Sequence, residues 1–503
     1  MKKRALISVS DKTNLTTFAA SLVDLDYEII STGGTEKALK EANIAVTPVE
    51  EITKFPECFG GRLKTLHPLI FGGLLFRRGN SEDEAQAKEL GIESIDLVVV
   101  NLYPFEETAR KEGVSQEELV EQIDIGGPSL LRAAAKNADH VTVICDIGDY
   151  DRVVYELKDN GETSTELRGE LARKVFLRTA AYDTAITQTL SGGTHTGVLL
   201  TNKTVLRYGE NPHQWGTYYD IYGSDKPRWK LHQGKEMSYL NILDADGALN
   251  LVCEFERPSC ACIKHASPCG VAVNDDIAEA FQRSYDADRL SAFGVIVALN
   301  RPCTKNIIDK IIEQKIFTEV IIAPGYEDGV LEFLAEKRPN IRAIEHQCPD
   351  EDAVTFRSSL GGMLVQNQDT KIVTKDDLTV ATETKPTDEQ IEDLLFAWKV
   401  VKHAKSNAIV FAKDLVSVGI GCGQTSRVDS TIIAARRAGE RAKGAVMASD
   451  AFFPFPDSVE EAAKNGIAAI IQPGGSIRDE EVITKANELG IGMVMTGVRG
   501  FRH

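Results

Sequence analysis

The chain has 503 residues, more than a single hydrophobic core usually supports, so two or more domains are expected. Its 43% hydrophobic and 26% charged residues are ordinary for a globular protein. The 75 acidic residues outnumber the 57 basic ones and give a net charge of −18. Such a field repels a phosphodiester backbone, which argues against nucleic-acid binding but allows a small phosphorylated ligand in a locally positive pocket.

The N-terminal stretch lacks the pattern of a secretory signal. After the basic start, only residues 5–7 are apolar before serine and charged residues intervene, and no later stretch approaches membrane-spanning length. The nine cysteines are an odd number scattered over the chain, which favours reduced thiols over a disulfide framework. We therefore expect a cytoplasmic protein that does not bind membranes.

Short apolar strands alternate with amphipathic helices in the first third of the chain. This alternation predicts a parallel sheet with helices on both faces. The last helix carries an apolar stripe suited to burial on one side. The expected strands are 4–9, 27–31, 95–101 and 141–145, and the expected helices are 14–25, 36–42, 129–136 and 166–190.

A glycine-rich segment at residues 191–197 ends this pattern and is the best candidate for a linker. A capping box at Thr387 then opens a helix that ends near His403. We expect two domains, 1–196 and 200–503. A large duplication inside the second domain is compatible with its pattern, but none is visible by eye. Its expected strands are 261–264, 294–299, 319–323, 408–412, 417–421 and 468–471.

A glycine turn at residues 31–35, Ser-Thr-Gly-Gly-Thr, follows a strand and precedes a helix. In that setting free backbone N–H groups and small hydroxyls can cradle a phosphate, although a simple tight turn explains the string equally well. The string matches neither the P-loop nor the dinucleotide-binding pattern, so neither a nucleoside triphosphate nor NAD is indicated.

Four further polar groups occur near glycine turns or strand ends in the same half. Lys64 lies in a string with paired glycines, Tyr103 follows a buried strand, Asp124 precedes a glycine turn, and Lys136 ends a helix. Each is weak alone, since a solvated basic turn would explain the first. Together they favour acid–base chemistry on a phosphoribosyl compound.

Five strings in this half resemble one enzyme family. They are Ser-Val-Ser-Asp-Lys-Thr (8–13), Ser-Thr-Gly-Gly-Thr (31–35), Gly-Gly-Arg-Leu-Lys-Thr-Leu-His-Pro (60–68), Asn-Leu-Tyr-Pro-Phe (101–105) and Gln-Ile-Asp-Ile-Gly-Gly (122–127). Residues 1–195 thereby resemble the inosinate cyclohydrolase domain, whose fold is similar to that of methylglyoxal synthase. The resemblance implies that Lys64, Tyr103, Asp124 and Lys136 act in ring closure, with Arg62 assisting. It implies substrate binding, including that of the 5′-phosphate, by Ser10, Lys12, Thr32, Gly33, Gly34, Thr35 and Thr65.

Two strings in the second half are rich in groups that can do chemistry. Residues 206–214 place Arg207, Tyr208, Asn211 and His213 in one short loop, which favours function over an exposed turn. Lys264 and His265 end a buried strand and face a Pro/Gly turn. A lone histidine is more often structural, but this pair at a strand end favours catalysis.

Four cysteines close to His265 raise the question of zinc. Cys253, Cys260, Cys262 and Cys269 form no C-x-x-C pair. Pro268-Cys269 is half of the zinc deaminase signature, but Ala272 stands where the second cysteine belongs and no H-x-E precedes it. A metal-dependent nucleoside deaminase is therefore disfavoured, and no metal is expected.

The second half resembles the aminoimidazole carboxamide ribonucleotide (AICAR) transformylase domain. The matching strings lie, in family order, at 206–214, 264–270, 291–294, 322–326, 405–408, 419–429, 449–457 and 501–503. That family folds as two cytidine-deaminase-like layers without the zinc. Departures are Ser267, Glu319, Cys422, Thr425 and Gly500, none of them an acid–base group. The resemblance implies a catalytic pair, Lys264 and His265; nucleotide binding by Arg207, Tyr208, Asn241, Gly294 and Arg427; and folate contacts from Phe293, Glu319, Asn407, Phe452 and Asp457.

The combined interpretation is an α/β protein of two enzymes. We expect a doubly wound, methylglyoxal-synthase-like parallel sheet, then duplicated cytidine-deaminase-like α/β/α layers. The resemblance implies formyl transfer from 10-formyltetrahydrofolate to the 5-amino group of AICAR, giving FAICAR, and cyclisation of FAICAR to IMP with loss of water. It also implies a homodimer. The alternatives are a zinc deaminase and a non-enzymatic nucleotide or folate sensor that kept the pockets.

Overall fold

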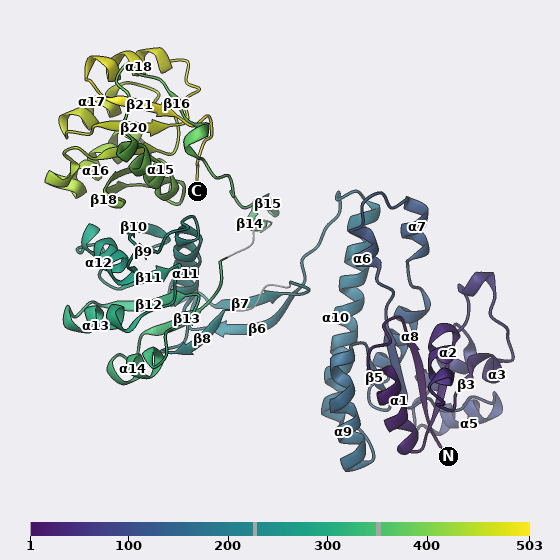
Figure 1. Cartoon of the computed structure of the whole chain (residues 1–503). Helices are drawn as coiled ribbons and strands as arrows, with labels where there is room; N and C mark the ends of the chain where they lie inside the picture. Colours follow the sequence, from purple (N-terminus) through teal and green to yellow (C-terminus); the bar gives the residue numbers. More distant parts are fainter. Residues whose placement is uncertain (1, 225–228, 349–353) are drawn as a thin grey trace. The chain divides into compact units, whose positions relative to one another are not determined.

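The computed structural model describes residues 2–224, 229–348 and 354–503. The chain forms two compact units, Met1–Thr201 and Asn202–His503 (Figure 1). In the described parts, no helix combines the length and the apolar character needed to cross a membrane.

The N-terminal unit is built on a five-stranded sheet of order β3-β2-β1-β4-β5, in which every pairing is parallel. Its inner strands are nearly continuous apolar runs because helices cover both faces. The strand order reverses between β1 and β4, and ligands of open α/β sheets bind beyond the carboxyl ends of the strands at such a point. The strands are β1 (Lys3–Val9), β2 (Tyr27–Ser31), β3 (Thr47–Pro48), β4 (Leu97–Asn101) and β5 (Thr142–Ile144).

Helices flank this sheet and share one core with it. The predicted parallel sheet with helices on both faces is confirmed, and the long predicted helix is α10. The α-helices are α1 (Leu15–Asp24), α2 (Gly33–Glu41), α3 (Val49–Thr53), α4 (Pro68–Leu75), α5 (Ser81–Glu89), α6 (Phe105–Ala109), α7 (Gln116–Glu121), α8 (Gly126–Lys136), α9 (Tyr150–Asn160) and α10 (Thr165–Leu190), and the 3-10 turns are η1 (Phe59–Gly61) and η2 (Ile147–Asp149).

The C-terminal unit is built on a twelve-stranded mixed sheet of order β16-β21-β20-β19-β17-β18-β10-β9-β11-β12-β13-β8. Two hairpins, β6–β7 and β14–β15, are separate from it. The sheet strands are β8 (Lys230–Gln233), β9 (Ser259–Lys264), β10 (Ser267–Val273), β11 (Val295–Leu299), β12 (Thr318–Ala323), β13 (Arg342–Glu345), β16 (Thr379–Val380), β17 (Ile409–Lys413), β18 (Val416–Gly421), β19 (Val446–Ser449), β20 (Ala469–Gln472) and β21 (Gly492–Met495). The hairpin strands are β6 (Leu200–Leu206), β7 (Gly216–Ile221), β14 (Val354–Ser359) and β15 (Gly362–Asn367).

The large sheet contains the same arrangement twice. The first lobe spans residues 239–345. Its hairpin β9–β10 is followed by β11, which pairs antiparallel with β9, then by β12, which pairs parallel with β11, and by β13, which pairs parallel with β12. In residues 388–495, the second lobe, β17–β18, β19, β20 and β21 repeat that order. The lobes meet where β10 and β18 pair antiparallel, at Ala272 and Val416. The predicted duplicated layers are confirmed.

The helices repeat in the same order. Helices α11 and α15 lie on one face of the sheet and share one core across both lobes. On the other face α12 and α13 pack into one core, while α16 and α17 belong to another. The first-lobe helices are α11 (Tyr239–Val252), α12 (Ile277–Ala287), α13 (Lys305–Glu313) and α14 (Val330–Lys337), those of the second are α15 (Asp388–Lys402), α16 (Arg427–Ala438), α17 (Asp457–Lys464) and α18 (Asp479–Glu488), and the 3-10 turns are η3 (Lys375–Asp377) and η4 (Gly439–Ala442).

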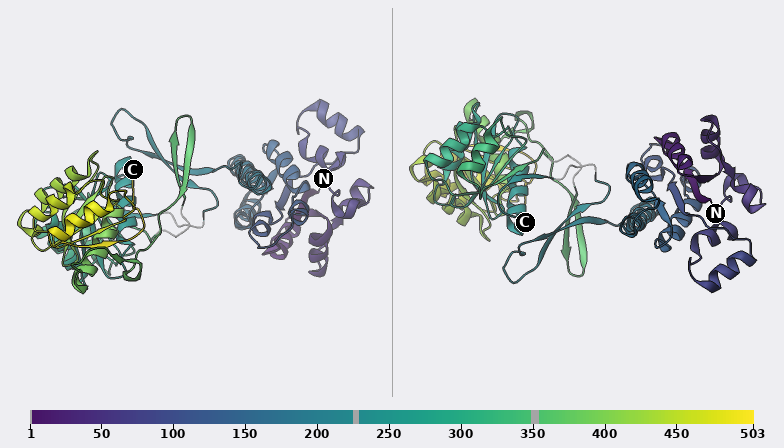
Figure 2. Two further views of the ribbon diagram at one scale, coloured as in Figure 1. Left: turned by 90° about the horizontal axis from the view of Figure 1, so that it is seen from above. Right: turned by 90° about the horizontal axis from the view of Figure 1, so that it is seen from below.

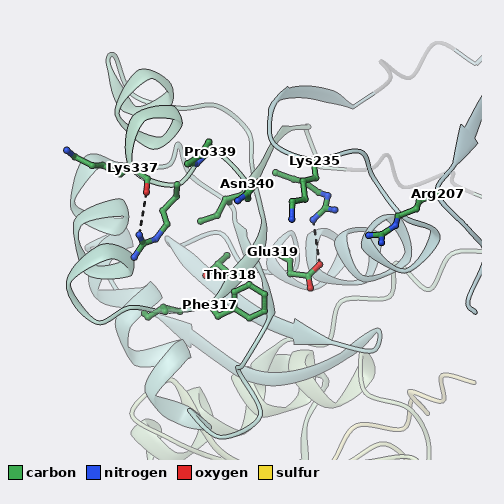
Figure 3. Close-up of a pocket in the computed structure, with 12 residues that line it drawn as sticks. Arg207, Lys235, Phe317, Thr318, Glu319, Lys337, Pro339 and Asn340 are labelled. Atoms are coloured by element: carbon green, nitrogen blue, oxygen red, sulfur yellow. Dashed lines mark hydrogen bonds and ion pairs between the residues drawn. The ribbon is translucent and has the colours of Figure 1, made fainter. Parts of the chain in front are cut away.

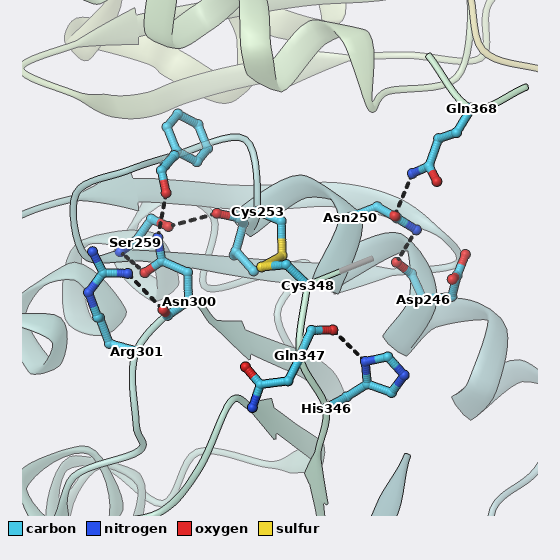
Figure 4. The surroundings of a disulfide bond; sticks show 12 residues. Asp246, Asn250, Cys253, Ser259, Asn300, Arg301, His346, Gln347, Cys348 and Gln368 are labelled. Carbon is cyan, nitrogen blue, oxygen red and sulfur yellow. Dashed lines mark hydrogen bonds between the residues drawn. A yellow bond between two sulfur atoms is a disulfide. The ribbon is translucent and has the colours of Figure 1, made fainter. Parts of the chain in front are cut away.

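One pair of cysteines departs from the expectation of reduced thiols. Cys253, which caps the C-terminus of α11, forms a disulfide with Cys348, just beyond β13 (Figure 4). The other seven cysteines are free. The expectation is therefore wrong for these two residues, because the fold brings together sulfur atoms that lie 95 positions apart in the sequence.

Candidate functional site

The carboxyl ends of β1 and β4 meet at the switch point of the N-terminal sheet, where Asn101 joins them. Its side-chain oxygen accepts hydrogen bonds from the backbone N–H groups of Ser10 (2.6 Å) and Asp11 (2.9 Å), and its amide donates to the carbonyl of Asp11 (2.9 Å). Asn101 therefore fixes the loop that carries Ser10 and Lys12. Sequence reasoning gave it no role, although it is the last residue of a buried strand.

The glycine turn at the start of α2 is flanked by two ammonium groups. A Cβ placed on Gly33 would lie 3.2 Å from Nζ of Lys64, and one on Gly34 would lie 3.9 Å from Nζ of Lys12. Thr35 is buried and its hydroxyl exchanges hydrogen bonds with the backbone of Val9, both of 3.0 Å, so this side chain anchors α2 to β1. A helix N-terminus with two lysines beside it attracts a phosphate.

Asp124 lies just before α8, whose first residue, Gly126, adjoins Thr65. Its carboxylate accepts a hydrogen bond of 2.8 Å from the N–H of Gly127, at the start of α8. Burial raises the pKa of Asp124, while N–H groups of Gly127, Tyr103 and Gly126 act to lower it. A carboxyl with a raised pKa is suited to exchanging a proton.

Three more groups complete the cluster. Lys64 forms an ion pair of 3.1 Å with Glu57, and the hydroxyl of Thr65 is 3.4 Å from the position of a Cβ on Gly126. The side chain of Tyr103 is exposed. Lys12 and Lys64 thus flank the glycine turn, while Thr65 adjoins the start of α8, where Asp124 accepts its hydrogen bond.

Two further predicted residues are exposed. Arg62 is exposed and forms an ion pair with Glu121 of α7. Lys136 is exposed and is the last residue of the 11-residue helix α8. At 1.5 Å per residue it lies about 15 Å along the axis from Gly126, toward the edge where β5 begins. The structure does not bring Lys136 to Asp124.

In the C-terminal unit, the predicted pair Lys264 and His265 lies at the β9–β10 turn. Lys264 pairs with Ser267 across the strands, so His265 and Ala266 form a two-residue turn. Both residues are left-handed, with φ of 57° and 52°, as a type I′ turn requires. His265 is exposed at the tip, and Nζ of Lys264 donates a 2.5 Å hydrogen bond to the carbonyl of Phe293.

The candidate nucleotide groups of the first lobe centre on Glu319. It accepts a hydrogen bond of 3.0 Å from the Asn241 amide and lies 3.6 Å from the buried guanidinium of Arg342. Burial lowers the pKa of Arg342, and Glu319 opposes this change. Arg207, Glu319 and Arg342 line a cavity of about 440 Å³, where Lys235 adds another positive charge (Figure 3). Arg342 and Lys235 were not singled out from the sequence.

The predicted catalytic pair lines a different cavity. Lys264 and His265 border a space of about 490 Å³, together with Gln424 and Arg436 of the second lobe. The bond from Lys264 to Phe293 connects the two cavities, because the Phe293 ring lies 5.0 Å from that of Phe317, which lines the first one. Gly294 needs its φ of 75°, and a Cβ there would lie 3.3 Å from the Phe317 ring.

Other loop groups form local contacts. The Arg207 guanidinium lies over the Tyr208 ring, 5.3 Å from its centroid. In the second lobe, Arg427 begins α16 and is buried, with bonds to the carboxylate of Asp450 and to the oxygen of Asn407 (2.7 Å). The Asn407 amide in turn donates to the carbonyl of Gln424 (3.0 Å), which brings it to the rim of the second cavity.

The remaining two predicted folate residues follow β19. Phe452 and Asp457 are exposed, and neither lines either cavity.

Comparison with known proteins decides the family. The family described as "AICARFT/IMPCHase bienzyme" matches residues 134–437. The chain belongs to this bienzyme family. The "MGS-like domain" family matches residues 14–129, within the N-terminal unit of the bienzyme.

Full-length relatives agree with this assignment. The bienzyme is 50% identical over 512 residues to the bifunctional purine biosynthesis protein PurH of Bacillus subtilis (strain 168), covering 100% of this chain and 99% of the relative. It is also 50% identical over 515 residues to PurH of Bacillus cytotoxicus, covering all of both chains. A solved structure titled "Crystal structure of ForH" is 34% identical over 38% of this chain and 99% of its own, with a TM-score of 0.36.

The bienzyme is therefore an enzyme of purine biosynthesis with AICAR formyltransferase and IMP cyclohydrolase activities. The predictions of family, fold class and function are confirmed, and the deaminase and sensor alternatives are set aside. Over residues 2–224, 229–348 and 354–503, no group of three or more His, Cys, Asp or Glu is placed to share a metal ion.

Proposed function

We propose that the N-terminal unit closes FAICAR to IMP and that the C-terminal unit transfers a formyl group from 10-formyltetrahydrofolate to the 5-amino group of AICAR. The observation that supports this division most strongly is that each unit has its own cluster of polar side chains. In one unit Lys12 and Lys64 flank a phosphate-type turn and Asp124 accepts a hydrogen bond at the start of α8, and in the other Lys264 and His265 border a cavity.

In the proposed cyclohydrolase step, the 5′-phosphate of FAICAR binds at the N-terminus of α2 beside Lys12. The carboxamide nitrogen attacks the formyl carbon of the same molecule, a C–N bond forms, and the former formyl oxygen leaves as water. Holding the two groups together supplies much of the acceleration, because the step is intramolecular. Lys64 stabilises the charge that develops on the formyl oxygen, and Asp124 and Tyr103 relay protons.

In the proposed transfer step, the 5-amino group of AICAR attacks the formyl carbon of the folate. This amine is a poor nucleophile because it is conjugated with the ring and carboxamide. His265 accepts its proton and Lys264 stabilises the tetrahedral oxyanion. The bond from the formyl carbon to N10 of the folate then breaks, and N10 takes up the proton from His265 as tetrahydrofolate leaves. Transfer to so weak an amine is thermodynamically reluctant, and cyclisation to an aromatic purine draws it forward.

We assign the binding roles by the same division. Asn241 and Arg342 hold Glu319 at the first cavity, which supports placing substrate groups there. Arg62 and Lys136 stay predictions for the cyclohydrolase site. The proposed nucleotide residues of the transferase are Arg207, Tyr208, Asn241, Gly294 and Arg427, and the proposed folate residues are Phe293, Glu319, Asn407, Phe452 and Asp457.

We also propose that the bienzyme is a homodimer in the cytoplasm. Every residue of hairpin β14–β15 is exposed, including Phe356, Met363, Leu364 and Val365, and Figure 2 shows it as a separate two-stranded arm. An isolated hairpin is at best marginally stable in water, and an apolar one is suited to a partner surface. A second subunit would also supply residues such as Phe452, which lines neither cavity.

A coupled assay with reciprocal variants tests the division of labour. Purified protein is mixed with AICAR and 10-formyltetrahydrofolate, and IMP and tetrahydrofolate are followed together. We expect His265→Ala to abolish transfer while cyclisation of preformed FAICAR continues, and Lys64→Ala to give the reverse. If His265→Ala retains full transfer, or if each variant impairs both reactions equally, the assignment of the two sites is wrong.

A further inference from the structure

The turn that carries His265 is held in a conformation that its own residues disfavour. Type I′ turns usually take glycine or asparagine at both central positions, because both need positive φ. Here His265 and Ala266 occupy them, with φ of 57° and 52°. The surrounding structure must therefore supply the interaction that keeps this turn closed.

That interaction comes from Asp244 on α11. The residue is 8% exposed, and its carboxylate accepts a 2.6 Å hydrogen bond from the backbone N–H of Ala266. Burial raises the pKa of Asp244, while the N–H of Ala266 and the side chain and backbone of His265 act to lower it. The carboxylate thus faces the His265 turn directly.

The second lobe contains the same device. Asp393 is the sixth residue of α15, as Asp244 is of α11. Its carboxylate accepts hydrogen bonds from the N–H groups of Asp414 (2.9 Å) and Leu415 (2.7 Å), which form the β17–β18 turn with φ of 52° and 57°. This turn carries no histidine. The duplication therefore provides a natural control for the purely structural effect of the contact.

Helix α11 also connects this contact to the substrate cavity. Asn241 and Asp244 are three positions apart and so lie on one face of the helix. Asn241 holds Glu319, and Asp244 holds the His265 turn. The helix therefore fixes the position of His265 relative to the cavity lined by Glu319.

We propose that Asp244 is a positioning residue of the formyltransferase, which holds the backbone of the His265–Ala266 turn so that the imidazole reaches the amine of AICAR. This inference rests on the proposed role of His265. Asp244 does not exchange the proton itself. Its counterpart Asp393 closes an equivalent turn that does no chemistry.

Matched substitutions in the full-length dimer test this role. We expect Asp244→Ala to lower the formyltransferase kcat at least tenfold, to change the KM for AICAR less than threefold, and to leave the cyclisation of FAICAR unchanged. Asp393→Ala removes the equivalent contact, and we expect its kcat to stay within twofold of the parent. If Asp244→Ala does not fold, Asp244→Asn takes its place and is compared with Asp393→Asn. Asparagine keeps an oxygen that can accept a hydrogen bond from the turn.

The outcomes separate this inference from the proposed function. If the Asp244 variants keep kcat within twofold while His265→Ala is inactive, His265 is catalytic but Asp244 does not position it. Equal losses in the Asp244 and Asp393 variants would mean that the contact acts only on folding, which also overturns the inference. If His265→Ala itself retains formyl transfer, the proposed role of His265 is wrong, and the inference about Asp244 falls with it.

Discussion

At the scale of single residues, the proposed cyclohydrolase site exposes Asp124 to two opposing influences on its pKa. Asp124 is held among backbone N–H groups, yet burial raises its pKa, so the carboxylate form is destabilised where the proposed chemistry needs a proton acceptor. Strain of this kind is common at functional sites, where activity is kept at a cost in stability.

Asp124→Asn therefore has opposite effects on activity and stability. We expect cyclisation of FAICAR to fall at least about 100-fold, the usual loss when an acid–base group is removed. Folding raises the pKa of Asp124, so its protonated form stabilises the fold below the ordinary value of 3.8, and that contribution is lost as the pH rises through the folded-state pKa. The variant should be more stable than the parent at pH 7, with a difference that shrinks toward pH 4.

Calorimetry of both proteins at the two pH values measures this difference. A variant that is less stable than the parent at pH 7 would contradict the expected cost of the buried carboxylate.

Gly33 offers a test of the proposed phosphate-binding turn. Its φ is 50°, and an added Cβ would lie 3.2 Å from Nζ of Lys64. We expect Gly33→Ala to raise the KM for FAICAR about tenfold or more, because the methyl group occupies space beside the lysine. Gly79→Ala is the matched control, since Gly79 also has positive φ but no atom within 4 Å of the added Cβ. An equal rise in KM for both variants would assign the effect to backbone strain alone.

At the scale of elements, α11 contributes to several features at once. Its N-terminal turn carries Asn241, its middle holds the His265 turn through Asp244, and its C-terminus is tied to Cys348. Its apolar side packs into the core shared with α15. Substitutions in this helix should therefore affect transfer more than cyclisation.

The disulfide at the end of α11 gives a prediction about stability. Cross-links that close a loop of about 100 residues are expected to stabilise the fold by about 4.7 kcal/mol in the chain-entropy model, and this one joins positions 95 apart. We expect Cys253→Ser to unfold at lower urea concentration than the parent under oxidising conditions. In dithiothreitol the two proteins should coincide, and Cys58→Ser, which removes a free thiol, should behave as the parent. If Cys253→Ser is still less stable to urea than the parent under reducing conditions, the lost stability comes from packing of the Cys253 side chain and not from the disulfide.

Much of this organisation follows from sequence, and the exceptions have physical reasons. Apolar runs predicted strands such as β4 and β11, because parallel and central strands are buried on both faces. Lys264 and His265 were found because they are adjacent and end such a strand. Asp244 was not found from the sequence, because no local pattern relates it to a turn that lies 21 positions further along the chain. The duplication was hidden because backbone pairing maintains it, while the equivalent turn residues differ, as His265 and Asp414 do.

Lys136 remains a prediction that the resemblance alone supplies. Its helix α8 begins beside Asp124, but the residue lies at the other end. The disulfide partners are far apart in sequence, and no spacing pattern relates them.

At the scale of the whole molecule, the apolar arm is the feature that most needs a partner. We expect the double variant Phe356→Asp/Leu364→Asp to sediment as a monomer and to lose formyl transfer, with cyclisation retained. Leu360→Asp, at the exposed tip of the same hairpin, should remain a dimer. Sedimentation velocity at several protein concentrations measures this. If the double variant still sediments as a dimer, the arm is not part of the dimer interface.

The pairing of β10 with β18 has a consequence for the origin of the C-terminal unit. Equivalent strands that run antiparallel side by side are related by a local two-fold axis, the geometry that two identical copies adopt when the same edge of each meets the other. A single-lobe ancestor could have assembled in this way, with two identical hairpins. Once both copies shared one chain, each hairpin could change independently. The two turns now differ, with His265 in one and Asp414 at the equivalent position of the other.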